Sequence, residues 1–324
     1  MNIYKIKKNT INIVAEYGIF ILVIIAVGIL SIFHPSFLNV ENLINLSQQI
    51  VLIGVLGLGV LFVLISGGLD ISLGTGISFG SVIIGVMIYF KHSLIAAIAV
   101  MVLSLLCVGS INGFFISKLK AGPIMVTLAM MTIIQGLTYL LAHGRYIEVR
   151  QYPFFDYLGR GRILGIPVLF IILVVLLFIS YVILNHTKIG TYLQAIGSNE
   201  SAAKSIGINI VQWKFIAYII SSIFMCIGAI VMIGRVLLVT PEISGFLILF
   251  DAIAAAFLGG VSLTGGKGSV KSIVIGSIII VLLNNATQML KIDPAWNGFF
   301  KGSVIIIAIM FTKLTGMVKK ENNT

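Results

Sequence analysis

Apolar residues in this chain gather in ten runs, which short polar or glycine-rich stretches separate. Most of these runs approach the roughly 20 residues that an α-helix needs to cross the hydrocarbon layer of a membrane. We therefore expect an all-α, polytopic integral membrane protein with about ten transmembrane helices, forming a single domain over residues 1–324. The runs cover residues 17–33, 50–66, 71–90, 94–116, 123–142, 166–184, 215–239, 246–261, 272–290 and 299–311.

Composition points to the same class. Of the 324 residues, 59% are hydrophobic and only 10% are charged, which is more apolar surface than a soluble domain can bury. Cys107 and Cys226 lie inside apolar runs without a second Cys or His at ligand spacing, so we expect neither a disulfide nor a metal site. The net charge of +11 does not indicate a nucleic-acid partner, because the basic residues are scattered in loops between the runs.

The distribution of basic residues predicts the orientation. Lysines precede the first run as in a signal peptide, but the run is long and no A-x-A site closes it, so we expect a span. With this start in the cytoplasm, thirteen of the 21 basic residues lie inside, as the positive-inside rule requires. Both termini and residues 192–208 are then cytoplasmic. The extracytoplasmic loop 143–165 departs from the rule, because it carries Arg145, Arg150, Arg160 and Arg162.

Two glycine-rich stretches, residues 66–76 and 259–269, interrupt the apolar pattern. Both contain paired glycines, then Ser-Leu and further glycines, which suggests an internal duplication. Broken helices at matching positions indicate a translocation path, because irregular backbone is tolerated at membrane depth only where protein or water satisfies it. A tight turn between two hairpin spans explains each stretch equally well when it is taken alone. The candidate path residues in these stretches are Gly67, Gly68, Asp70, Ser72, Gly259, Gly260 and Ser262.

The second stretch resembles a nucleotide-binding loop only in part. Gly266-Lys267 matches the end of a P-loop, but that motif also needs an earlier Gly and a following Ser or Thr, where this chain has Val261 and Gly268. The apolar runs contain no metal-ligand spacing and no nucleophile with a base. We therefore expect no catalytic residue and no cofactor bound by this chain.

Two acidic residues lie within or beside the apolar runs at places that need an explanation. An ionised Asp in mid-span costs on the order of 2.5–3.5 kcal/mol, so Asp251 must face protein or water. It either lines a path for a polar solute, or caps a broken helix or pairs with Arg235 or Lys271. Asp70 precedes a predicted helix, where a carboxylate favours a capping role.

Residues 192–208 read YLQAIGSNESAAKSIGI, a polar stretch with helix-forming spacing between two apolar runs. A polar helix at this place indicates a soluble partner, although an ordinary interfacial helix is the alternative. Its alanines allow close approach, and Gly197 and Gly207 allow a break at each end. Glu200 and Lys204 are spaced to form an i,i+4 ion pair.

Several motifs together resemble the permease subunit of the bacterial ribose-type sugar ABC importers. The resemblance runs from about residue 37 to residue 313 and keeps the order of the motifs. One departure is Leu249, at a position where the family carries an acidic residue. The motifs are SGGLDISLG at 66–74, Asn112-Gly113 ahead of 123–127, residues 192–208, DAIAA at 251–255, and residues 259–269.

This resemblance implies a multi-pass protein of the bacterial inner membrane, surrounded by lipid and working with a second permease copy. A cytoplasmic ABC ATPase would use the ATP, and an extracytoplasmic sugar-binding protein would deliver the sugar. The four loop arginines would dock that protein, unless Glu148 and Asp156 neutralise them locally. The residues implied to couple to the ATPase are Tyr192, Gly197, Asn199, Glu200, Ala202, Ala203 and Gly207.

Two functions remain open at this point. One is the pathway-forming subunit of an ATP-driven importer for ribose or a related monosaccharide. The other is an ion-coupled secondary transporter of a small polar solute, with Asp251 as the coupling carboxylate. The polar stretch 192–208 favours the importer, because a secondary transporter needs no segment for docking an ATPase.

Overall fold

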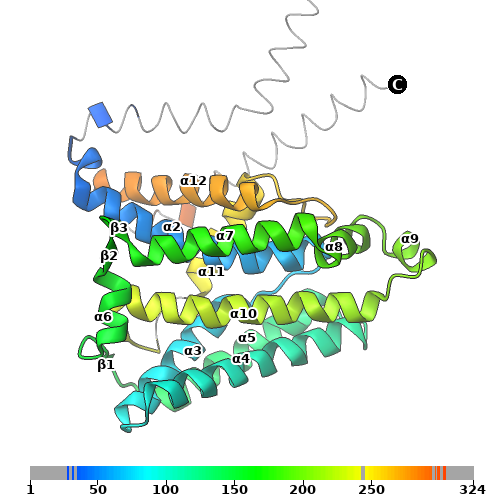
Figure 1. The fold of residues 1–324 in the computed structure, drawn as a ribbon, viewed down its shortest axis with the longest axis horizontal. Helices are drawn as coiled ribbons and strands as arrows, with labels where there is room; N and C mark the ends of the chain where they lie inside the picture. Colours follow the sequence, from blue (N-terminus) through cyan, green and yellow to red (C-terminus); the bar gives the residue numbers. More distant parts are fainter. Residues whose placement is uncertain are drawn as a thin grey trace, which may run out of the picture. The chain divides into compact units, whose positions relative to one another are not determined.

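A computed structural model of the chain is almost entirely helical (Figure 1). It describes residues 28, 31–32, 35–241, 245–293, 296, 298–299 and 302–303. Two compact units make up the chain: Met1–Leu46 with Ile278–Thr324, and Ser47–Ser277. The second unit contains most of the predicted site residues.

Seven helices among the described residues are long and apolar enough to cross a membrane. They are α2 (Val40–Ile65), α3 (Ser72–Tyr89), α4 (Leu94–Ser117), α5 (Pro123–Ala142), α7 (Val168–His186), α10 (Ile210–Val236) and α12 (Val270–Met289). With the shorter α11 (Gly245–Leu258), they correspond to eight of the ten predicted runs. The runs 17–33 and 299–311 fall almost entirely outside the described residues.

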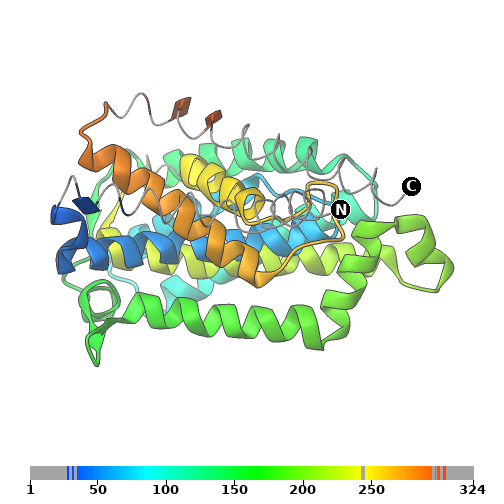
Figure 2. The ribbon, with the colours of Figure 1, turned by 90° about the horizontal axis from the view of Figure 1, so that it is seen from above.

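The remaining elements are short and connect the long helices. The polar helices are η1 (Pro35–Leu38), α6 (Pro153–Arg160), α8 (Lys188–Ser198) and α9 (Glu200–Ser205). Two antiparallel strand pairs accompany them: β1 (Ile147–Glu148) with β4 (Leu238–Val239), and β2 (Arg162–Ile163) with β3 (Ile166–Pro167). In two perpendicular views, α8 and α9 lie at one end of the second unit, beyond the ends of α7 and α10 (Figures 1 and 2).

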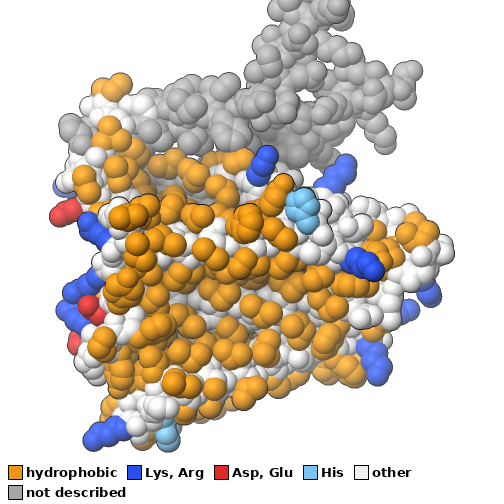
Figure 3. Space-filling view, viewed as in Figure 1, with side chains coloured by type: hydrophobic (Ala, Val, Ile, Leu, Met, Phe, Trp, Pro, Cys, Tyr) orange, Lys and Arg blue, Asp and Glu red, His pale blue; other side chains and the backbone are white. Residues whose placement is uncertain are grey.

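The long helices of the second unit form an inner and an outer group. The apolar windows of α2 and α3 are 83% buried inside the protein, whereas those of α4, α5 and α7 are 22–28% buried. On one face, apolar side chains cover α4, α7 and α10, with Lys and Arg gathered at the two ends of these helices (Figure 3). The outer group therefore presents its side chains to lipid, while α2 and α3 form the core.

Between α2 and α3 the chain turns back along α2. Ser66 to Ile71 is not helical, and Ser66 and Asp70 are both buried. Leu73, at the start of α3, packs against Gly59, six positions before the end of α2. Six residues of α-helix span about 9 Å. The first glycine-rich stretch therefore contains a re-entrant segment, residues 66–71, which protein covers except at the exposed Gly67.

The short helix α11 begins well away from β4. Its first residue, Gly245, contacts Gly74 of α3, whereas Val239 of β4 packs against Gly85 of the same helix. These two positions on α3 are about 16 Å apart along the helix, which is roughly half the thickness of a hydrocarbon core. The predicted span 246–261 is therefore a helix of 14 residues that begins at depth.

The second glycine-rich stretch is a turn that joins α11 to α12. The amide of Ser262 donates to the carbonyl of Lys267 at 2.9 Å, which closes the turn. Gly260, Gly265 and Gly266 have φ angles of +92°, +87° and +73°, which favour glycine. This stretch therefore forms a turn between two helices, as the alternative interpretation expects, and the internal duplication stays a prediction.

Candidate functional site

A buried polar cluster holds the re-entrant segment in place. Oδ1 of Asp70 accepts hydrogen bonds from the backbone amide of Ser72 at 3.1 Å and from its hydroxyl at 2.6 Å. Oδ2 accepts from the Ser221 hydroxyl on α10 at 2.8 Å. Nδ2 of Asn112, on α4, donates to the Ser72 hydroxyl at 2.9 Å. Asp70 lies one residue before Ile71, the N-cap of α3, and binds the Ser72 amide at the helix start without being the N-cap itself. Asp70 also ties α3 to α10, and Ser72 ties it to α4.

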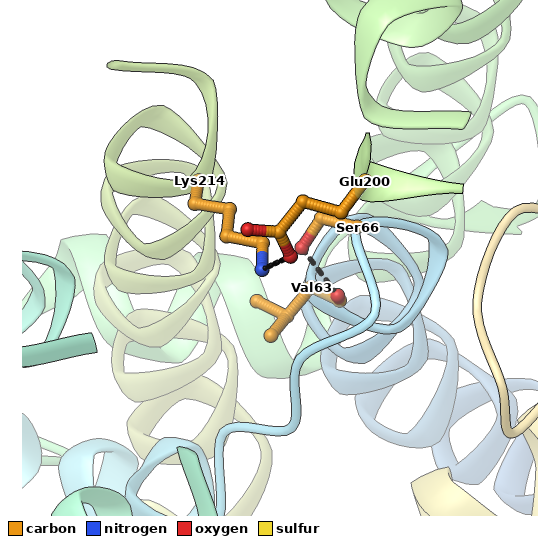
Figure 4. A network of polar contacts seen from close by, with 4 residues as sticks. All are labelled: Val63, Ser66, Glu200 and Lys214. Atoms are coloured by element: carbon orange, nitrogen blue, oxygen red, sulfur yellow. Dashed lines mark hydrogen bonds and ion pairs between the residues drawn. The ribbon is translucent and has the colours of Figure 1, made fainter. Parts of the chain in front are cut away.

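The backbone of the re-entrant segment also finds its partners within the protein. The carbonyl of Leu69 accepts from the Tyr218 and Thr127 hydroxyls, each at 3.4 Å. Val63, in the last turn of α2, accepts from the hydroxyl of Ser66 at 2.7 Å, as Figure 4 shows. This satisfaction by protein groups is what permits irregular backbone at membrane depth.

The structure brings some of the predicted path residues together and separates others. Gly67, Gly68, Asp70 and Ser72 share the re-entrant segment and the start of α3, whereas Gly259, Gly260 and Ser262 lie in the α11–α12 turn. Asp251 lies on α11 and is 8% exposed. Their role in a path stays a prediction.

Leu249 replaces the acidic residue expected from the family, and it lies on α11 in full burial. A Cβ placed on Gly74 of α3 would lie 2.7 Å from the Leu249 Cβ, so the two helices touch at this point. An apolar side chain fits this close packing, because a carboxylate here would be taken out of water. The substitution therefore suits the contact between α3 and α11.

The polar stretch 192–208 forms two short helices and not one. Asn199 interrupts it, and its Oδ1 caps α9 by accepting from the amide of Ala202 at 3.0 Å. Gly207, with φ +84°, then lets the chain turn into α10. The expectation of one continuous helix is wrong, because the Asn side chain satisfies the free amides at the start of a new helix.

The α8–α9 hairpin has a small core of its own. Ile196, Ala203 and Ile208 are buried together, and Tyr192 and Trp213 of α10 pack against them. These two rings meet edge to face, with centroids 5.0 Å apart. Ala203 is only 2% exposed. Ala203 therefore supports the hairpin from inside, with Tyr192 half-buried against it, and the coupling role of both residues stays a prediction.

Other residues of the hairpin are accessible. Ile206, which sequence reasoning missed, is 76% exposed at the end of α9. An isoleucine beside a glycine in an otherwise polar stretch was the signal that could have identified it. The predicted residues that do lie on the exposed surface are Asn199, Glu200, Ala202 and Gly207.

Glu200 pairs with a different lysine than predicted. Its Oε2 lies 2.6 Å from Nζ of Lys214 on α10 (Figure 4). Lys204 is exposed. Because α9 has only six residues and Glu200 starts it, the neighbouring helix α10 supplies the closer cation. This bond ties α9 to α10.

The four loop arginines have different surroundings. The Arg145 guanidinium lies over the ring of Tyr89, 4.9 Å from its centroid, at the end of α3. Arg160 lies 3.5 Å from Asp156 in an exposed i,i+4 pair, so one of the two predicted local neutralisations is confirmed. Arg150 and Arg162 are exposed, and so is Leu164, at 98%, at the tip of the β2–β3 hairpin.

Comparisons with known proteins identify the family. Residues 42–309 match the family model described as "Branched-chain amino acid transport system / permease component". The chain is also 36% identical over 297 residues to the ribose import permease protein RbsC of Bacillus subtilis, covering 91% of each chain. The chain belongs to the family of bacterial ribose-type ABC importer permeases.

Other relatives agree with this assignment. The permease is 32% identical to the ribose import permease protein RbsC of Haemophilus influenzae, over 94% of its own length and 95% of the relative. It is 33% identical to the L-arabinose transport system permease protein AraH of Escherichia coli, over 94% and 92%. No solved structure matches the chain. The family and the seven apolar helices make it a multi-pass protein of the bacterial inner membrane.

Proposed function

We propose that the permease forms the transmembrane pathway of an ATP-driven importer for ribose or a related monosaccharide. An extracytoplasmic binding protein delivers the sugar, and an ABC ATPase docks at the α8–α9 hairpin, which faces the cytoplasm. A second copy of the chain completes the pathway. The relatives named above as ribose and arabinose permeases support the class of substrate.

The hairpin is the observation that carries this proposal. It lies beyond the membrane helices, is held by its own core and by the Glu200–Lys214 ion pair, and exposes Ile206. A rigid element with an exposed apolar tip is what a docking interface requires, because central apolar anchors supply most of the binding free energy. An ion-coupled transporter has no use for such an element.

Co-purification tests the docking. Ile206→Asp places a charge on the exposed tip without entering the hairpin core, so we expect the variant to fold, to reach the membrane and to lose the ATPase. Lys204→Ala, a change at another exposed position of α9, is the control, and we expect it to keep the ATPase. Retention of the ATPase by Ile206→Asp would reject docking at this tip.

A reconstituted system tests the transport itself. In proteoliposomes with the ATPase and the binding protein, we expect uptake of labelled ribose or arabinose that requires ATP on the α8–α9 side. Uptake by the permease alone, driven by a proton or sodium gradient, would contradict the proposal and support a secondary transporter.

A further inference from the structure

Four glycines from three segments meet beside the C-terminal end of α8. Gly67 belongs to the re-entrant segment, Gly197 to α8, and Gly265 and Gly266 to the α11–α12 turn. A Cβ placed on Gly265 would lie 2.9 Å from Cα of Gly67 and 3.0 Å from the carbonyl oxygen of Gly197. We call this meeting point the glycine junction.

The glycine junction has no room for a side chain on Gly197 or Gly265. A Cβ on Gly197 would lie 2.5 Å from the amide nitrogen of Gly266 and would overlap the carbonyl oxygen of Ile65. At Gly197 backbone therefore rests directly on backbone, and the neighbouring Ser198 hydroxyl lies against Gly266. Because protein interiors are close-packed and hardly compressible, a displacement of one segment passes to the others.

A hydrogen bond joins the junction to the end of α2. The amide of Gly266 donates to the carbonyl of Ile65 at 3.0 Å. This carbonyl belongs to the last turn of α2, where the helix itself provides no donor. The α11–α12 turn thus caps α2 at the same place where α8 touches it.

The two segments that leave the junction meet again deeper in the protein. The re-entrant segment leads to Asp70 and the start of α3, and α11 runs from the turn to its first residue, Gly245. Gly245 contacts Gly74 in the first turn of α3. The re-entrant segment and α11 therefore both lead from the α8–α9 hairpin to one contact between α3 and α11, which lies beside the predicted path residues.

We propose that the glycine junction transmits movement of the α8–α9 hairpin to the starts of α3 and α11, with Gly197 as its positioning residue. This inference rests on the proposed docking of the ATPase at the hairpin. A methyl group on Gly197 points at Ile65 and Gly266, into the glycine junction. A side chain at Gly197 separates the three segments and uncouples ATP hydrolysis from transport.

Gly197→Ala in the complete transporter tests this proposal. We expect the variant to co-purify with the ATPase and to keep its basal ATP hydrolysis, while stimulation by the sugar-loaded binding protein and ATP-driven uptake both fall roughly tenfold. Gly136→Ala is the matched control, because a Cβ on this α5 glycine meets nothing within 4 Å. It should behave like the unmodified protein.

Each outcome decides the proposal. Assembly with unchanged stimulation and uptake would overturn it. Should Gly197→Ala not assemble, Gly265→Ala leaves α8 itself unchanged and places the methyl group on the α11–α12 turn, facing Gly67 and the carbonyl oxygen of Gly197. Its assembly with lost stimulation supports the proposal, whereas normal stimulation, or failure of both variants to assemble, would overturn it. If the unmodified permease itself does not bind the ATPase, the proposed function fails, independently of the junction.

Discussion

Ser221→Ala removes one tie that holds the re-entrant segment. The Ser221 hydroxyl donates to Oδ2 of Asp70 at 2.8 Å, and both side chains are at most 1% exposed. Without this donor, a carboxyl oxygen is left buried in a site closed to solvent. Leaving one buried polar group unsatisfied costs about 1–3 kcal/mol, so we expect the free energy of unfolding to fall by that amount.

The neighbouring serine provides a control for this prediction. Ser222 is also buried, but its hydroxyl donates to the carbonyl of Ile219 in its own helix at 2.8 Å. Without the Ser222 hydroxyl, the Ile219 carbonyl still takes part in the backbone hydrogen bonds of the helix. We therefore expect Ser222→Ala to change the free energy of unfolding by less than about 1 kcal/mol. The measurement is unfolding of the purified permease in mixed micelles. Equal losses for the two variants would refute the role of Asp70 as an anchor.

Three further predictions concern the α8–α9 hairpin and the loop 143–165. Ala203→Asp buries a charge in the hairpin core and should unfold the hairpin, whereas Ala202→Asp, on the exposed side, should leave it folded; protease sensitivity of the hairpin distinguishes the two. Lys214→Ala breaks a partly exposed ion pair and should lower the free energy of unfolding by at most about 1 kcal/mol, again measured in mixed micelles. Arg150→Glu with Arg162→Glu should weaken stimulation of ATP hydrolysis by the binding protein; unchanged stimulation argues against docking at the loop.

Hydropathy alone located the eight helices of the described runs, because a membrane helix must be apolar along its whole length. Hydropathy did not predict that α11 begins at membrane depth. The polar break at residues 240–245 is expected between two full spans as well, and only the contacts of Val239 and Gly245 with α3 distinguish a full span from a short helix.

The candidate site was predictable where local chemistry decides it. The bond from the Ser72 amide to Asp70 follows from the place of Asp70 before the helix, but its bond to Ser221 joins residues 151 positions apart and no local pattern contains it. The same holds for Glu200, where the i,i+4 rule selected Lys204 and tertiary packing supplies Lys214.

The glycine-rich stretches show the limit most clearly. Their similar sequences suggested equivalent positions in a duplicated fold. In the structure one is a re-entrant segment and the other a turn, and they meet each other through Gly67 and Gly265. Glycine is needed in both for positive φ and close approach, so similar composition alone does not establish a duplication.

ATP-dependent uptake in proteoliposomes tests the central claim most directly. The permease is reconstituted with the ATPase, with the binding protein on the opposite side, and uptake of labelled ribose is followed with and without ATP. We predict uptake that requires all three components and that Ile206→Asp abolishes. Uptake that persists without the ATPase, or in Ile206→Asp, would contradict the claim that ATP-driven movement enters this permease through the α8–α9 hairpin.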